Sequence, residues 1–164
     1  MQFNILGKDI VSEIISRSLP PSEECVYMCI GTEHILSDSL GPRVGNILME
    51  QDKKAIFVYG YMGNNINALN LLKAYRVIKL LHPDKKVVVI DAAVGETTEI
   101  GSVQILEGGT TPGAATNKNL PNIGDYSILG IIGIKGLKDF YVTSYDREKL
   151  LEHMSKIIAE AITA

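Results

Sequence analysis

Short apolar runs alternate along the chain with longer segments in which apolar residues recur every three or four positions. The short runs predict strands because β-branched and aromatic residues dominate them and turn residues bound them. They occupy residues 25–30, 55–59, 87–90, 102–106 and 128–134. Strands that alternate with helical segments are typical of βαβ units, so the pattern predicts an α/β fold with a mostly parallel central sheet.

The segments of helical period predict four helices. One covers residues 9–19 and ends at Pro20-Pro21, and a second runs from Pro42, in its first turn, to Glu50. A long helix is expected to begin near Asn65 and to end at Pro83. Its buried stripe is predicted to contain the following apolar residues: Ile66, Leu69, Leu72, Tyr75, Ile78, Leu80 and Leu81.

The last segment begins with Thr143-x-x-Asp146, a capping pattern for a terminal helix. Five apolar residues then recur at helical spacing: Leu150, Met154, Ile157, Ile158 and Ala161. Such a stripe packs against a sheet far more often than it binds a cofactor. We therefore expect this helix to cover one face of the sheet.

Length and charge narrow the class of protein. The 164 residues fit one α/β domain spanning residues 1–164, and 46% of them are hydrophobic, which is enough to form a sizeable core. The net charge of -3 provides no broad basic field, so we expect no nucleic-acid partner. No apolar stretch approaches the roughly 20 residues of a membrane span, and no export signal is recognisable. A cytoplasmic protein that does not bind membranes is expected.

The two cysteines, Cys25 and Cys29, lie in one predicted strand. Residues four apart in a strand share a face but are about 13 Å apart, which is too far for a disulfide or a shared zinc ion. Two buried, reduced thiols are therefore expected.

Two aspartates follow predicted strands, where ligands bind in open parallel sheets. Asp91 comes directly after the apolar run 87–90. A carboxylate that leaves a buried strand is costly to desolvate unless it is paired or used, so a functional role is favoured. Asp38 precedes the helix that opens with Gly41-Pro42, and helix capping is the more common role for an aspartate at such a position.

A third candidate segment is the loop at residues 107–117, which is rich in glycine and threonine. It is long for a structural connection, and its backbone N–H groups could approach a substrate. It lacks the spacing of a dinucleotide fingerprint and the lysine of a phosphate loop, so nucleotide binding is not expected.

Several short motifs of the chain resemble motifs that occur in the same order in the bacterial spore germination protease family, whose members are atypical aspartic endopeptidases. Asp38-Ser39-Leu40-Gly41-Pro42 is similar to the Asp-Ala-Leu-Gly-Pro of that family, and Ile90-Asp91-Ala92 to its Ile-Asp-Ala. The remaining matches are Met62-Gly63, Ser102-Val103-Gln104-Ile105, Pro112-Gly113 and Asn117. The shorter YyaC-type sporulation proteins are more similar still. Together the motifs span roughly residues 25–135.

The resemblance implies a three-layer αβα, phosphorylase/hydrolase-like fold and a catalytic pair formed by Asp38 and Asp91. Two adjacent carboxyls share a proton, so one can activate water while the other protonates the substrate. Backbone donors in the loops would hold the substrate or stabilise an oxyanion. The substrate-binding residues expected on this basis are Met62, Gly63, Asn64, Gly108, Gly109, Thr110, Pro112, Gly113 and Asn117.

The resemblance also implies a sporulating cell or the spore interior as the location, and a peptide or protein substrate such as the small acid-soluble spore proteins. No cofactor is expected. The chain is much shorter than the germination protease, so the substrate and the activity itself stay open. The loop also has Ala114-Ala115-Thr116 where that family has more glycine, which would narrow the approach of a backbone.

Two alternatives remain at this stage. The hydrogenase maturation endopeptidases, thought to share this fold, bind nickel through carboxylates and a histidine, and His34 lies four residues before Asp38. The loop after Leu106 offers no histidine, so paired-aspartate chemistry is preferred to a metal. The other alternative is a non-catalytic protein that uses the same cleft to bind a peptide or partner.

Overall fold

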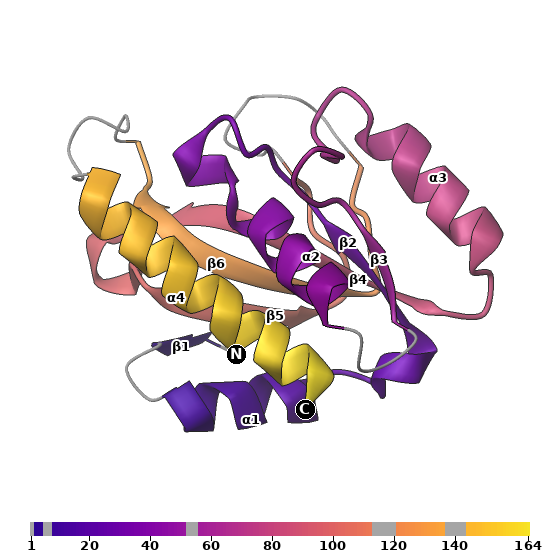
Figure 1. Ribbon diagram of the computed structural model, residues 1–164, viewed down its shortest axis with the longest axis horizontal. Helices are drawn as coiled ribbons and strands as arrows, with labels where there is room; N and C mark the ends of the chain where they lie inside the picture. The colour runs from indigo at the N-terminus through magenta and orange to yellow at the C-terminus, as the bar shows by residue number, and fades with distance from the viewer. Residues whose placement is uncertain (1, 5–7, 52–55, 113–120, 137–143) are drawn as a thin grey trace.

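A computed structural model describes residues 2–4, 8–51, 56–112, 121–136 and 144–164 of the chain. The strands of these residues form one six-stranded sheet in the order β1-β5-β6-β4-β2-β3 (Figure 1). Neighbours among β3, β2, β4 and β6 are parallel, whereas β5 is antiparallel to both β6 and β1. The strands are β1 (Gln2–Asn4), β2 (Cys25–Cys29), β3 (Phe57–Tyr59), β4 (Lys86–Gly95), β5 (Ser102–Glu107) and β6 (Tyr126–Ile134).

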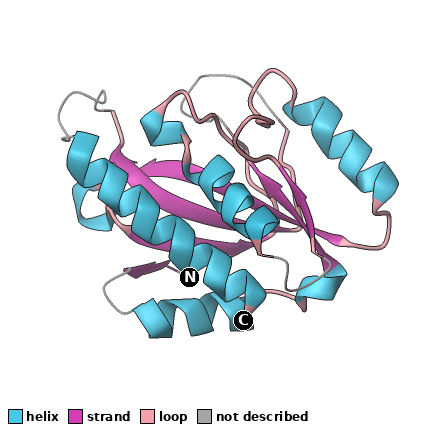
Figure 2. Cartoon of the chain, in the orientation of Figure 1, coloured by secondary structure: helices cyan, strands magenta, loops and turns pink. Residues whose placement is uncertain are grey.

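Helices cover both faces of the sheet, which confirms the predicted α/β fold with a mostly parallel central sheet (Figure 2). Three helices pack on one face and α3 packs on the other. The helices are α1 (Lys8–Ser18), α2 (Leu40–Glu50), α3 (Leu71–Leu81) and α4 (Ser144–Thr163), and the short 3-10 turns are η1 (Ser22–Glu24), η2 (Leu36–Asp38) and η3 (Thr97–Glu99).

Strand β2 has apolar side chains on both faces of the sheet, so helices must pack on both faces to bury them. Cys25, Tyr27 and Cys29 pack toward α1, α2 and α4, and the alternating Val26 and Met28 pack toward α3. All five residues are buried, as expected for the continuous apolar run of a central parallel strand. The two cysteines are free and share one face, as predicted from their spacing.

Strand β4 is longer than predicted. It does not end before Asp91 but continues to Gly95, because β6 goes on pairing with it and places Asp91 opposite Leu129. Strand β2 stops pairing with β4 at the pair of Cys29 and Ile90. Asp91 therefore lies inside a strand, at the point where one of its two neighbouring strands has ended.

The predicted start of the third helix is wrong, and its predicted buried stripe is confirmed only for Ile66, Tyr75 and Ile78. Asn67 and Asn70 form a turn in which the Asn70 side chain accepts a bond from the Asn67 N–H at 2.9 Å, so α3 begins at Leu71. The sheet side of α3 is formed by Leu71 and Ile78, with Ala74 and Tyr75 beside them. Four residues assigned to the core are exposed instead: Leu69, Leu72, Leu80 and Leu81.

The stripe of the last helix is confirmed. In α4, Met154, Ile157, Ile158 and Ala161 are buried against the sheet and the neighbouring helices, and Leu150 is partly buried beside them. Thr143, the predicted cap, lies outside the described residues. Among the helices that the structure describes, none has the length and apolar character needed to cross a membrane.

Candidate functional site

Asp91 has a buried carboxyl group in the middle of the sheet. Only 6% of the residue is exposed, because β6 continues beside it and helices cover both faces. One of its oxygens, Oδ1, accepts a bond from the N–H of Ala92 at 2.8 Å. Beyond the end of β2, Ile30 still donates its N–H to the carbonyl of Ile90, so the chain leaves β2 directly beside Asp91.

Asp38 lies at the end of the loop that follows β2. Its backbone carbonyl accepts a bond from the N–H of Thr32 at 2.9 Å, which closes the loop on itself. A Cβ at Gly31 would overlap the same carbonyl, and Gly31 has a φ of 134°, so glycine permits this close approach. The N-cap of α2 is Ser39 rather than Asp38, so the capping role considered for Asp38 is not the one it has.

The two aspartates are brought into electrostatic contact. Burial raises the pKa of Asp91 well above its ordinary value, and the nearby charge of Asp38 raises this pKa further. The bond from Ala92 partly opposes both effects. Burial also raises the pKa of Asp38, against a smaller lowering by the backbone N–H of Thr32. Burial and the nearby charge thus both favour the protonated form of Asp91.

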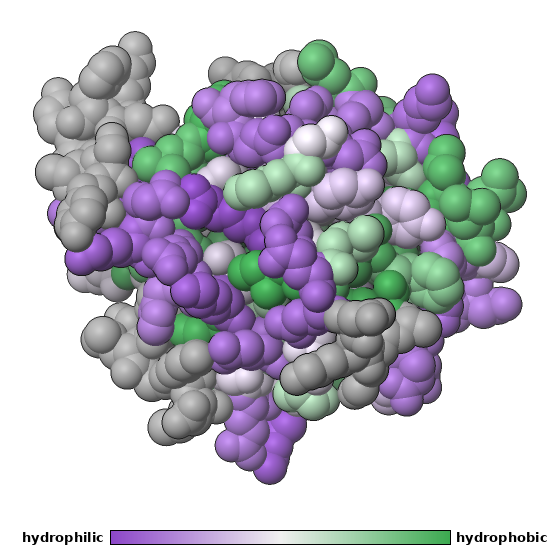
Figure 3. Space-filling view, in the orientation of Figure 1, coloured by the Kyte–Doolittle hydropathy of each residue, from purple (hydrophilic) through white to green (hydrophobic). Residues whose placement is uncertain are grey.

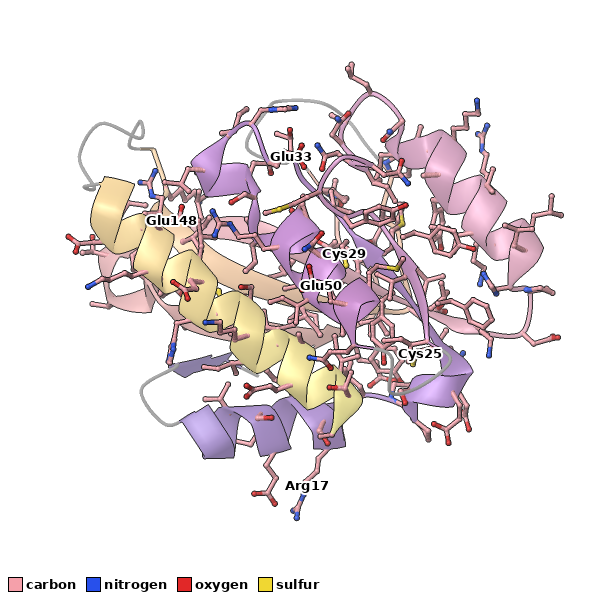
Figure 4. The ribbon with its side chains drawn as sticks, in the orientation of Figure 1. Arg17, Cys25, Cys29, Glu33, Glu50 and Glu148 are labelled. Carbon is pink, nitrogen blue, oxygen red and sulfur yellow. The ribbon has the colours of Figure 1, made fainter. Side chains whose placement is uncertain are left out.

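A chain of hydrogen bonds ties the Asp38 turn to α4. The Ser39 hydroxyl donates to the carbonyl of Leu36 at 2.8 Å and accepts from Nε of Arg43 at 3.0 Å. The two terminal nitrogens of Arg43 contact the two carboxylate oxygens of Glu148 at 2.7 and 2.8 Å. Glu148, labelled in Figure 4, extends from α4 toward α2. Such a bidentate pair fixes orientation as well as charge, so it holds η2 in place.

The predicted residues Met62, Gly63 and Asn64 form an exposed turn after β3. The N–H of Gly63 donates to Oε2 of Glu33 at 2.7 Å, and the N–H of Asn64 donates to the carbonyl of Tyr61 at 2.9 Å. Figure 4 labels Glu33 on the loop after β2, so this bond joins the two loops. Both N–H groups already have acceptors here, so an oxyanion would have to displace one of these acceptors.

Asn65 follows this turn and was not selected from the sequence. Its side-chain oxygen is buried and has no hydrogen-bond partner among the described residues. The next residue, Ile66, accepts a bond from the N–H of Gly31 at 2.8 Å, which brings Asn65 into the loop cluster around Asp38. A buried acceptor without a donor is uncommon, and it is suited to a donor on a ligand or a water molecule.

The glycine-rich loop leaves from the other end of the sheet. Because β5 is antiparallel to β6, Glu107 pairs with Tyr126 at the amino end of β6, not at the end where Asp91 lies. The N–H of Gly108 then donates to Asp125 at 2.7 Å, and Thr110 pairs with Ile123.

The neighbours of this loop are residues of the segment that returns to β6. A Cβ at Gly109 would crowd Asn122 and Ile123, and Pro112 is buried. The predicted residues Gly113 and Asn117 lie outside the described residues. The assignment of this loop to substrate binding stays a prediction.

The metal alternative finds no support in the side chains. Across the described ranges, no group of three or more His, Cys, Asp or Glu side chains is positioned to hold a metal ion. His34 is exposed, and its backbone N–H donates to the side-chain hydroxyl of Thr32 at 3.3 Å. The paired aspartates are thus the chemically distinctive feature of this site.

Sequence reasoning missed the supporting residues of Asp38. Ser39 and Arg43 are four residues apart, the spacing at which helical side chains meet, so their contact had a local signal. Glu148 is 105 residues further along than Arg43, and no local pattern connects the two.

Comparisons with known proteins agree with the fold. A solved structure, the NiFe hydrogenase maturation protease HycI from Thermococcus kodakarensis KOD1, superposes with a TM-score of 0.52 and 20% sequence identity. The match covers 88% of this chain and 98% of that one. At this identity the likeness concerns the fold alone.

Sequence comparison identifies nearer relatives. The chain is 34% identical over 155 residues to a protein of Bacillus subtilis (strain 168) described as "Uncharacterized protein YyaC", and this covers 93% of the chain and 76% of the relative. Residues 4–161 match the family described as "Protein of unknown function (DUF1256)". The chain therefore belongs to the DUF1256 family.

Proposed function

We propose that this protein is an endopeptidase in which Asp38 and Asp91 share a proton and together hydrolyse a peptide bond. The observation that carries the proposal is the buried carboxyl of Asp91, whose pKa is raised by burial and by the charge of Asp38. Carboxyl groups with pKa values shifted in this way are concentrated at catalytic sites. The fold shared with a maturation protease is consistent with this activity.

The different surroundings of the two aspartates suggest their roles. Asp38 is half-buried whereas Asp91 is buried, so Asp38 acts as the base that removes a proton from a water molecule. The water oxygen bonds to the carbonyl carbon. Asp91, which carries the shared proton, protonates the carbonyl oxygen, so that a tetrahedral diol forms. The proton taken by Asp38 then passes to the leaving amine as the C–N bond breaks, and one hydroxyl of the diol returns a proton to Asp91 as the carboxylic acid product forms. Both carboxyls end the cycle with one proton between them.

The substrate is an extended segment of a peptide or protein. The unpartnered oxygen of Asn65 would accept an N–H of its backbone, and the exposed turn at Met62, Gly63 and Asn64 would contact its side chains. The N–H of Gly63 becomes available to the substrate only if Glu33 releases it. Substrate binding is therefore expected to move the loop that carries Glu33.

The biological setting belongs to the same proposal. A role in sporulation is proposed on the motifs that resemble those of the spore germination protease family. Small acid-soluble spore proteins, in the cytoplasm of a sporulating cell or in the spore interior, are the substrates to test first.

Cleavage assays test the proposal. Purified protein is incubated with small acid-soluble spore proteins and with a peptide library, beside Asp38→Asn, Asp91→Asn and Asp84→Asn. Either site variant should lower kcat by about 10²–10⁴-fold, the usual contribution of acid–base groups. Asp84 is exposed, so its variant should retain full activity. The rate should be bell-shaped against pH, because the active form holds one proton between two groups.

Three outcomes would reject the proposal. Cleavage that survives in both site variants would assign the chemistry to other groups. Cleavage abolished by a chelator would restore the metal alternative. Wild type and variants that cut nothing but bind the same peptide equally would identify a non-catalytic binding protein on this fold.

A further inference from the structure

The outer surface of α3 is apolar although it faces solvent. Figure 3 shows hydrophobic residues gathered at the right of the molecule, where α3 lies in Figure 1. The exposed fractions are large for apolar side chains: 90% for Leu69, 80% for Leu80, 59% for Leu81, 43% for Val77 and 36% for Leu72. Single exposed leucines are ordinary, but neighbouring ones on one element mark a site of interaction.

Helix geometry places these residues opposite the core. At 3.6 residues per turn, Leu71 and Ile78 lie on the side of α3 that faces the sheet, and Leu72, Val77 and Leu80 lie on the outer side. Leu69 precedes the helix, and Leu81 ends it. Four residues of the predicted stripe, Leu69, Leu72, Leu80 and Leu81, are therefore apolar but are not buried by the sheet.

The charges of the same surface have one sign. The helix sequence LLKAYRVIKLL contains Lys73, Arg76 and Lys79 and no acidic residue, in a chain whose net charge is -3. Lys79 lies 4.0 Å from Asp125 and belongs to the edge of the surface. Lys73 and Arg76 are exposed, and helical spacing places them on either side of Leu80, in the centre of the outer face. We call the surface formed by Leu69, Leu72, Lys73, Arg76, Val77, Leu80 and Leu81 the α3 surface.

We propose that the α3 surface binds an amphipathic helix of a partner protein that carries acidic residues within its apolar stripe. The leucines would meet the apolar stripe of the partner, and Lys73 and Arg76 would meet its carboxylates, as in other helix-to-helix recognition. The outer face of α3 is about 16 Å long, so it matches about three turns of a partner helix.

The position of the two cations decides between possible occupants. On a lipid surface, the centre of the outer face of α3 would enter the membrane most deeply, and basic residues favour such binding when they lie at the margins of the apolar face. Lys73 and Arg76 lie at the centre instead, so a lipid surface is disfavoured. Pairing of α3 with α3 of a second copy would bring cations against cations. An acidic partner helix satisfies both the apolar and the charged groups.

This surface is independent of the proposed peptidase activity. It belongs to the helix on the opposite face of the sheet from α2, the helix that follows Asp38. A failure of the peptidase proposal would leave the binding prediction intact, and the reverse also holds.

Fluorescence anisotropy with the whole protein tests the inference. The probe is a labelled synthetic helix of about 14 residues with leucines at helical spacing and glutamates among them. A second peptide keeps every leucine and replaces each glutamate with lysine. The acidic peptide should bind at least tenfold more tightly than the basic one, and the preference should weaken as salt is raised.

Matched variants locate the binding. The double variant Leu69→Ser, Leu80→Ser should weaken binding at least tenfold, and Lys73→Glu, Arg76→Glu should reverse the preference between the two peptides. Arg17→Glu, at an exposed position of α1, is the control and should bind as wild type does. All of these positions are exposed, so thermal unfolding should confirm that each variant is folded.

Other results would overturn the inference. Equal binding of both peptides, or binding unchanged in the α3 variants, would show that the surface is not selective. A dimer of wild-type protein that Leu80→Ser dissociates would assign the surface to a second copy. Binding to vesicles of anionic lipid without binding to the acidic peptide would assign it to a membrane.

Discussion

Asp91 lies one residue beyond the last pair between β4 and β2, close enough to Asp38 for the charge of Asp38 to raise the pKa of Asp91. The two side chains come from positions 53 residues apart (91 minus 38) and meet because β2 and β4 are neighbours whose carboxyl ends share one edge. Because β2 ends there, Asp91 has no paired neighbour on that side, and the loop after β2 carries Asp38 close to it. The topology of the sheet thus creates the pair.

The raised pKa of Asp91 has a cost in stability that depends on pH. Above a pH of about 3.9 the unfolded chain releases the proton of Asp91, whereas the folded protein still holds it. The free energy of unfolding therefore falls as the pH rises from about 3.9 through the raised pKa of folded Asp91. Asp91→Asn keeps an acceptor for the Ala92 N–H and removes the ionisation. The variant should be more stable than wild type at pH 7, by on the order of 1 kcal/mol.

Urea unfolding at several pH values measures this effect. The difference between Asp91→Asn and wild type should shrink as the pH is lowered to about 3, where wild-type Asp91 is mostly protonated in both states. Asp84→Asn, at an exposed position, should follow wild type at every pH. A difference that stays constant with pH would contradict the raised pKa.

The bidentate contact between Arg43 and Glu148 should matter more for activity than for stability. Arg43→Met removes the bonds to Ser39 and Glu148, which loosens the Asp38 turn. Because the Glu148 side chain is 49% exposed, the loss of stability should be about 1 kcal/mol. Cleavage should fall at least tenfold, since a misplacement of about 1 Å at a catalytic group costs more than that.

Lys156→Met is the matched control for Arg43→Met. It breaks another ion pair of α4, between Lys156 and Glu152 at 2.7 Å, whose side chains are 55% and 58% exposed. Stability should not change measurably, because this pair is screened by solvent, and cleavage should not change. Hydrogen exchange should rise at residues 36–39 in Arg43→Met alone. Equal effects of the two variants would show that Arg43 does not position Asp38.

Gly41 is required for the close approach of α2 to β2. A Cβ at this position would lie 2.6 Å from the backbone nitrogen of Ile30 and closer still to its carbonyl oxygen. Gly41→Ala should therefore destabilise the protein by about 1–3 kcal/mol, as other overpacking substitutions do. At Gly133 a Cβ would meet only the Val94 side chain, at 3.2 Å, so Gly133→Ala should cost less than about 1 kcal/mol. Thermal unfolding compares the two, and equal losses would contradict the packing argument.

Both cysteines should be inert in the folded protein. Burial raises the pKa of the Cys25 thiol and that of the Cys29 thiol, and the residues have no exposed surface. The thiolate is the reactive form, so a thiol reagent should modify them only after unfolding. Rapid modification of native protein at neutral pH, with full modification in urea as the reference, would show that β2 is accessible.

The order of the elements and the mostly parallel sheet could be predicted from the sequence, whereas the antiparallel pairing of β1 and β5 could not. The runs that became β2, β4, β5 and β6 carry their own signal in β-branched residues. The antiparallel orientation of β5 depends on its partner β6, and β1 has only three residues, so neither has a local signal. For the same reason the sequence placed the glycine-rich loop at the end of the sheet where Asp91 lies, although it leaves from the other end.

The α3 stripe illustrates a second limit of sequence patterns. The predicted stripe combined apolar residues from both sides of α3, and only packing against the sheet decides which side is buried. The side with more leucines is the exposed one. At the site, the sequence selected Asp38 and Asp91, which lie close enough to interact electrostatically, and their catalytic role stays a prediction. Arg43 and Glu148 required the packing of α2 on α4.

The most direct test of the aspartate pair is an NMR titration of the carboxyl carbons of Asp38 and Asp91 in wild type and in Asp38→Asn. Asp91 should titrate well above an ordinary aspartate in wild type, and its pKa should fall when residue 38 can no longer carry a charge. It should still remain raised, because burial is the larger cause. A pKa of Asp91 that is ordinary, or that does not respond to Asp38→Asn, would contradict the pair and with it the proposed mechanism.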